Sequence, residues 1–145
     1  MLRKLSFGVA TFAIAFATAP QLRAGDTPEA VASKLLTGGA TRDWLAGSVK
    51  TWMGSSTSCS PGEVYHFSMD MTVRIEECLN GKRLETKTTW TLMSKDSLDM
   101  LINVGEKTYY LIFAKQNGRQ HMILRERGDS KVDPITDHDF ALSED

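Results

Sequence analysis

Runs in which apolar and polar residues alternate fill much of the middle and end of the chain, and turn dipeptides separate them. A period of two is typical of β-strands that bury one face. The strongest turn signals are Asn80-Gly81 and Asn117-Gly118, because both central positions of a type I′ hairpin need positive φ. A further turn is predicted at Gly105-Glu106. The pattern predicts consecutive antiparallel hairpins rather than alternating strands and helices.

These turns define one inward face. The hairpin at Asn80-Gly81 sets Val73 opposite Thr88, with the apolar side chains of both strands on one face. The two later turns each place Leu111 and Phe113 inward, so they agree about which face is the core. The predicted interior, also the predicted ligand-binding set if the interior is hollow, comprises Val64, Met71, Val73, Ile75, Trp90, Met100, Ile102, Tyr109, Leu111, Phe113, Met122 and Leu124. The same residues could equally form a solid core.

Eight strands are predicted in total. Residues 63–68 are expected to pair back onto residues 71–78 through a turn near Met69-Asp70, and further strands are expected at about 48–53 and 136–142. Eight strands suffice to close a small barrel whose interior is filled by side chains or holds one small ligand. The predicted fold class is therefore all-β, an eight-stranded antiparallel up-and-down barrel with a short N-terminal helix.

The short helix precedes the strands. Asp26-Thr27-Pro28-Glu29 is typical of a helix start, and Gly38-Gly39 ends the helix after about Leu36. The outward face of the last two hairpins carries Leu101, Tyr110, Ile112 and Ile123 and is more apolar than a solvated face usually is. The helix is the nearer candidate to cover this outer apolar patch, through Val31, Leu35 and Leu36. A protein partner bound through Tyr110, Ile112 and Ile123 is the alternative.

The N-terminal 24 residues are typical of a secretory signal peptide. Arg3 and Lys4 precede an uncharged apolar stretch that is shorter than the roughly 20 residues needed to cross a bilayer. Cleavage is predicted after Ala24, which leaves residues 25–145 as a single barrel domain in the periplasm or outside the cell. We expect no stable membrane span after the signal is removed.

Export gives the two cysteines a role. In an oxidising compartment Cys59 and Cys78 are expected to form one disulfide, which closes a loop of about 20 residues and contributes roughly 3 kcal/mol in the chain-entropy model. Two unpaired buried thiols are the alternative. Neither a redox motif nor a zinc site is predicted, because the chain has no Cys-x-x-Cys and its histidines stand at no recognisable metal spacing.

Composition and charge exclude several classes of protein. Hydrophobic residues make up 41% and charged residues 24%, which fits one globular domain. Loss of three basic and no acidic residues with the signal changes the formal charge from −1 to −4, so nothing favours nucleic-acid binding. No spacing of nucleophile, base or metal ligands indicates catalysis, and no cofactor is expected. His66 and His121 have no acidic partner that the sequence alone can identify, and Asp137-His138-Asp139 is interpreted as a solvated acidic tail.

Four short segments resemble the lipocalin-like (calycin) group of small exported bacterial β-barrels. They are Leu45-Ala46-Gly47, His66-Phe67-Ser68-Met69-Asp70 before Thr72-Val73, Thr89-Trp90-Thr91-Leu92 before Asp96-Ser97-Leu98, and Met122-Ile123-Leu124-Arg125. The resemblance covers about residues 44 to 127. It implies an up-and-down barrel whose commonest use is binding a hydrophobic ligand, and it also allows an enzyme inhibitor.

The sequence therefore favours a non-catalytic, exported protein that holds a small apolar molecule inside a barrel. The second hypothesis is a protein-interaction module, such as an enzyme inhibitor or envelope factor, that uses the outer apolar patch. An enzyme is the least favoured class.

Overall fold

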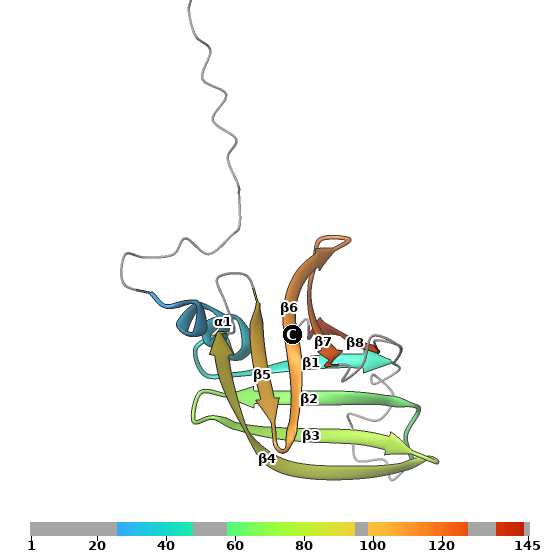
Figure 1. Cartoon of the computed structure of the whole chain (residues 1–145). Helices are drawn as coiled ribbons and strands as arrows, with labels where there is room; N and C mark the ends of the chain where they lie inside the picture. Colours follow the sequence, from blue (N-terminus) through green and yellow to red (C-terminus); the bar gives the residue numbers. More distant parts are fainter. Residues whose placement is uncertain (1–25, 48–57, 95–98, 128–135, 144–145) are drawn as a thin grey trace, which may run out of the picture.

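The chain folds into a closed eight-stranded antiparallel barrel with one helix (Figure 1). The computed structural model describes residues 26–47, 58–94, 99–127 and 136–143. The elements are α1 (Pro28–Thr37), β1 (Thr41–Gly47), β2 (Gly62–Ser68), β3 (Thr72–Leu79), β4 (Lys82–Ser94), β5 (Met100–Val104), β6 (Lys107–Gln116), β7 (Arg119–Glu126) and β8 (Asp137–Leu142). Each strand pairs with its neighbours in sequence, and β1 pairs with β8 to close the barrel. The predicted fold class is confirmed.

The predicted turns at Asn80-Gly81, Gly105-Glu106 and Asn117-Gly118 and the registers they set are also confirmed. Asn80 and Asn117 both have φ of 52°, and each is followed by a glycine with positive φ, as a type I′ turn requires. Val73 lies opposite Thr88, and Phe113 lies opposite Met122. The local turn chemistry therefore fixes which face of each ribbon points inward.

The first strand that the structure describes was not predicted from the sequence. The first strand is β1, at Thr41–Gly47, and it begins directly after the glycines that end α1. The alternation of apolar and polar residues is interrupted in this short segment, because the charged Arg42 faces the same side as Trp44. Arg42 donates a hydrogen bond to the carbonyl of Leu35 at 2.9 Å. The strand expected at 48–53 lies outside the described residues, as do the signal segment and Leu98.

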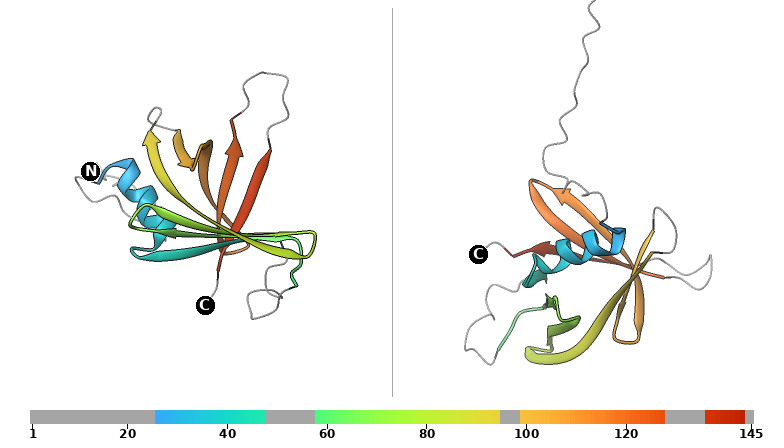
Figure 2. Two further views of the ribbon diagram at one scale, coloured as in Figure 1. Left: turned by 90° about the horizontal axis from the view of Figure 1, so that it is seen from below. Right: turned by 90° about the vertical axis from the view of Figure 1, so that its left-hand side faces the viewer.

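Helix α1 covers one end of the barrel. Thr27 caps the helix by accepting a hydrogen bond from the Ala30 amide, and the buried Leu36 joins the barrel core. The indole of Trp44 donates to the Leu36 carbonyl at 2.9 Å, which fastens the helix to β1. Figure 1 and Figure 2 show α1 beside the end where β1 begins and β4 ends. The helix contacts β1, β2 and β4, so the expectation that it covers the outer apolar patch on β5, β6 and β7 was wrong.

The core consists mainly of the inward side chains of all eight strands. The buried members are Ala32, Leu36, Trp44, Tyr65, Phe67, Val73, Trp90, Ile102, Val104, Tyr109, Leu111, Met122, Leu124 and Phe140. Several aromatic rings contact one another, among them Tyr65 and Phe140 with ring centroids 4.8 Å apart. Burial of such rings supplies much of the hydrophobic stabilisation of a domain of this size.

Two predicted interior residues lie elsewhere. Met71 is in the turn between β2 and β3 with φ of 65° and 45% exposure, because this turn is one residue longer than expected. Val64 is buried on the outer face, where it forms a second cluster with Cys78, Leu45 and Cys59. The alternation along β2 therefore places Tyr65 and Phe67 inside.

Candidate functional site

The two ends of the barrel differ in how far their inward side chains are exposed. Along the inner face of β4, Trp90 is 2% exposed, Thr88 is half-buried, Thr86 is exposed and Leu84 is 48% exposed. The pairing of β4 with β5 begins only at Trp90, and among the described strands none pairs with Arg83–Lys87 on that side. The inner face of β4 is therefore buried next to α1 and accessible at the opposite end of the barrel.

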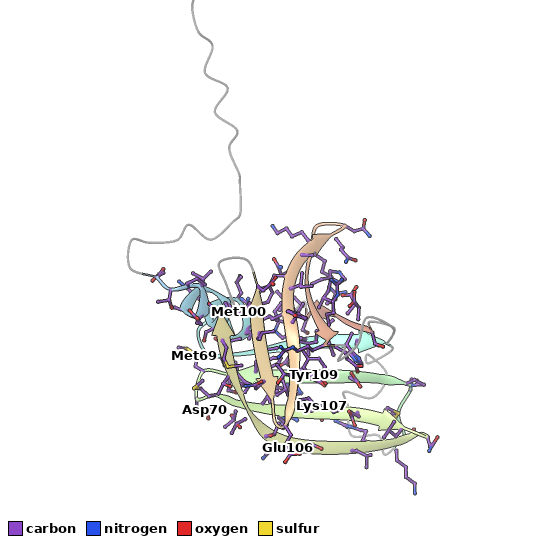
Figure 3. All side chains as sticks on the ribbon, in the orientation of Figure 1. Met69, Asp70, Met100, Glu106, Lys107 and Tyr109 are labelled. Atoms are coloured by element: carbon purple, nitrogen blue, oxygen red, sulfur yellow. A yellow bond between two sulfur atoms is a disulfide. The ribbon has the colours of Figure 1, made fainter. Side chains whose placement is uncertain are left out.

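We call this region the open end, and it is lined by inward side chains of six strands. The register and alternation assign to it Glu63, Tyr65, Ile75, Glu77, Leu84, Thr86, Lys107, Tyr109, Glu126 and His138. Figure 3 labels Tyr109 and Lys107 on β6, with Lys107 next to the turn at Glu106. Apolar surface and a few polar groups thus meet where the barrel is accessible, as in small-ligand sites.

Two carboxylates face each other at the open end. Glu63 and Glu77 are directly opposed across β2 and β3, an arrangement that destabilises a sheet. Burial raises the pKa of Glu63, and the negative charge of Glu77 raises it further, whereas His138 and Lys107 lower it. A carboxylate whose pKa is perturbed by burial and by a neighbouring like charge is a candidate functional group.

Two tyrosines, Tyr65 and Tyr109, lie near these carboxylates. Tyr65 is 8% exposed and Tyr109 is 7% exposed, so both residues are largely removed from solvent. Burial raises the pKa of Tyr65 well above its usual range, and the charges of Glu63 and Glu77 add to this effect. No hydrogen-bond partner for either hydroxyl is found in the part of the chain that the structure describes. A buried hydroxyl without a partner costs about 1–3 kcal/mol, so a ligand or water is needed there.

The structure brings together most of the predicted ligand-binding residues. Val73, Trp90, Ile102, Tyr109, Leu111, Met122 and Leu124 belong to the buried core, and Met100 and Phe113 are half-buried against it. Of the predicted set, Ile75 and Tyr109 lie at the open end. The sequence prediction missed Tyr65, Glu63 and Glu77, although the assignment of Tyr65 would have followed from the correct alternation along β2.

The outer face carries a buried charged network that the sequence did not predict. His66 Nδ1 lies 2.6 Å from Asp43 Oδ1, and His66 Nε2 lies 2.8 Å from Glu76 Oε2. Each ring nitrogen of His66 is therefore engaged by an acidic side chain. Arg83 donates to Glu76 at 2.7 Å, and Arg74 lies 3.3 Å from it.

This network, which we call the His66 network, is better explained as a structural feature than as a catalytic site. Burial raises the pKa of Glu76, but the hydrogen bonds from His66 and Arg83 and the charge of Arg74 outweigh it and lower the pKa below its usual value. His66 borders a polar groove of about 640 Å³. Because both of its nitrogens are engaged, His66 has no free lone pair to act as a general base.

A second histidine also has an acidic partner. His121 Nδ1 lies 2.7 Å from Asp139 Oδ1, in an outer groove of about 290 Å³. The groove is lined by Leu45, Ala46, Gly47, Arg119, His121, Asp139 and Ala141. A His–Asp pair activates a neighbouring nucleophile in hydrolases, but no serine, threonine or cysteine is among these lining residues. His138 instead contacts Glu126 at 3.0 Å.

The predicted disulfide is confirmed. Cys59 and Cys78 are bonded with their Cα atoms 5.8 Å apart, and the bridge lies outside the barrel wall beside Val64. The bond indicates an oxidising, extracytoplasmic compartment. Within the described ranges, no helix combines the length and apolar character that a membrane span requires. Nor do three His, Cys, Asp or Glu side chains of those ranges converge closely enough to hold a metal ion.

No protein-family model matches the chain, and neither a curated protein nor a solved structure is significantly similar to it.

Proposed function

We propose that this chain is an exported, non-catalytic binding protein of the lipocalin-like kind, periplasmic or secreted, that takes a small apolar molecule into its barrel through the open end. One observation carries the proposal: inward-facing positions of β4 change from buried at Trp90 to exposed at Thr86 and Leu84. A closed barrel of eight strands is just wide enough to hold one small ligand.

The site is limited in depth. Trp90, Ile102, Met122 and Phe140 are almost fully buried against one another, and α1 covers the end beside them. A ligand therefore occupies the half of the barrel that Ile75, Thr86 and Tyr109 line rather than its full length. This favours a compact molecule, because only a short apolar body can be buried there.

The proposal is tested by titration with N-phenyl-1-naphthylamine, an uncharged lipophilic probe whose fluorescence rises in apolar surroundings. We expect saturable binding to the mature, disulfide-bonded protein. Thr86→Trp fills the open end and is expected to weaken binding at least tenfold. The control is Lys87→Trp, which places the same ring one residue away on the outer face.

Circular dichroism and thermal unfolding establish that both variants remain folded. Absence of saturable binding by the wild type would contradict the proposal. So would equal weakening by Thr86→Trp and Lys87→Trp, because the probe would then bind outside the barrel.

A further inference from the structure

We propose that the ligand carries a positively charged amine, which the carboxylates and tyrosine hydroxyls of the open end bind while its apolar body lies in the barrel. This inference rests on the proposed function, because it assigns the chemistry of the molecule that enters the same site. Two other features of the surface carry no ligand assignment. The charged groups of the His66 network already pair with one another, and nothing in the structure identifies what would bind to the outer apolar patch.

The charges at the open end favour a cation. Glu63 and Glu77 are directly opposed, and Glu126 lies opposite Tyr109 on the adjoining wall. The positive groups on the same face are Lys107 and His138, and His138 is already engaged by Glu126 at 3.0 Å. In the free protein the repulsion between Glu63 and Glu77 is unfavourable. A bound ammonium group would reduce that repulsion, and the reduction would favour binding.

The tyrosines supply a second, independent indication. Both residues are more than nine-tenths buried, and their hydroxyls lie near the same carboxylates and have no hydrogen-bond partner among the described residues. A phenol oxygen can accept a hydrogen bond from an ammonium group, and the ring face of tyrosine attracts cations. Tyr65 and Tyr109 therefore complete a site for an N–H donor with positive charge.

The spacing of the acidic groups points away from a metal ion. Within the described part of the chain, no three carboxylate, imidazole or thiol groups stand close enough to coordinate one ion. An organic ammonium group is larger than a metal ion and binds through separate hydrogen bonds, so it does not need a tight cage of ligands. Its attached apolar chain also matches Ile75 and Leu84 beside the carboxylates.

The experiment compares three ligands of equal chain length by displacement of the fluorescent probe, at concentrations below micelle formation: decylammonium, decanol and decyl sulfate. We expect decylammonium to bind at least tenfold more tightly than decanol, and decyl sulfate to bind more weakly than either. The preference for decylammonium should shrink as salt concentration rises, because added ions screen charges at a partly exposed site.

Matched variants locate the effect. Glu77→Gln is expected to reduce the preference for decylammonium over decanol at least threefold and to leave decanol binding unchanged. Glu85→Gln removes the same charge from the outer face of β4 and should leave the preference intact. Tyr65→Phe, which keeps the ring, should also reduce the preference.

The outcomes separate the two proposals. Equal binding of decylammonium and decanol, or equal effects of Glu77→Gln and Glu85→Gln, would overturn the amine assignment and leave the apolar-ligand function standing. If none of the three ligands displaces the probe and the probe itself does not bind saturably, both proposals are wrong.

Discussion

Removal of the negative charge of Glu76 is expected to destabilise the fold strongly, although the residue lies on the outer face of the barrel. Glu76 accepts short hydrogen bonds from His66 at 2.8 Å and from Arg83 at 2.7 Å, and its side chain is buried. Hydrogen bonds to charged groups contribute about 1.5–3 kcal/mol each, and a broken buried ion pair costs about 3–5 kcal/mol. Because Arg74 and Arg83 are partly exposed and can turn to water, we expect Glu76→Gln to cost about 3 kcal/mol.

The assay is urea unfolding of the oxidised protein at pH 7, followed by tryptophan fluorescence. A loss of about 3 kcal/mol corresponds to a fall in the melting temperature of roughly 10 °C for a domain of this size. The control is Glu85→Gln, whose exposed carboxylate lies 3.5 Å from Arg74 and should contribute less than about 1 kcal/mol. Equal stability of Glu76→Gln and the wild type would refute the reasoning that His66 depends on two carboxylates.

The contribution of Glu76 to the stability of the fold has a defined pH dependence. The pKa of Glu76 is lower in the folded protein than its ordinary value of 4.5, so folding favours the ionised form. Its stabilisation is therefore fully present above about pH 4.5 and is lost as the pH falls through the lowered pKa. The difference between wild type and Glu76→Gln should shrink across that acidic range, and a constant difference down to the acid transition would contradict the assignment.

Three further predictions concern the backbone, the disulfide and the open end. Gly47→Ala should lower the free energy of unfolding in urea by about 3 kcal/mol, because φ is +75° and an added Cβ would lie 2.8 Å from the Pro61 carbonyl oxygen. The control is Gly118→Ala, where φ is similar but the added Cβ meets open space, and it should cost only about 1 kcal/mol. Equal losses in the two variants would exclude the clash at Gly47. Replacing Cys59 and Cys78 by alanine should lower stability by about 3 kcal/mol for a sequence separation of 19, and an unchanged urea midpoint would contradict this. Glu63→Gln should raise stability at pH 7 by about 0.5 kcal/mol, because burial and the charge of Glu77 raise the folded pKa and ionisation opposes folding above it. This gain should vanish as the pH falls and Glu63 becomes protonated; a loss of stability at pH 7 would mean that Glu63 is paired.

Sequence reasoning succeeded where local chemistry determines structure. The positive φ required at Asn80 and Asn117 fixed two hairpins, and those turns fixed the inward face of four strands. It failed where a turn lacks a strong signature. The turn near Met69 holds one residue more than expected, which moved Met71 out of the interior and exchanged the faces assigned along β2.

The charged groups could not be assigned from the sequence because their neighbours are distant along the chain. His66 is joined to Asp43 by the pairing of β1 with β2, and the register of β1 was not predicted. The opposed pair Glu63 and Glu77 depends on the same β2 register. The exposure of Thr86 follows from where β5 stops pairing with β4, which alternation does not encode.

The location of the bound molecule tests the account most directly. Intermolecular nuclear Overhauser effects can be measured between the alkyl chain of decylammonium and the side chains of the isotope-labelled, disulfide-bonded protein. The account predicts contacts to Ile75 and Tyr109 at the open end. Contacts confined to Ile112 and Ile123 on the outer apolar patch would contradict it and would favour a role in protein interaction.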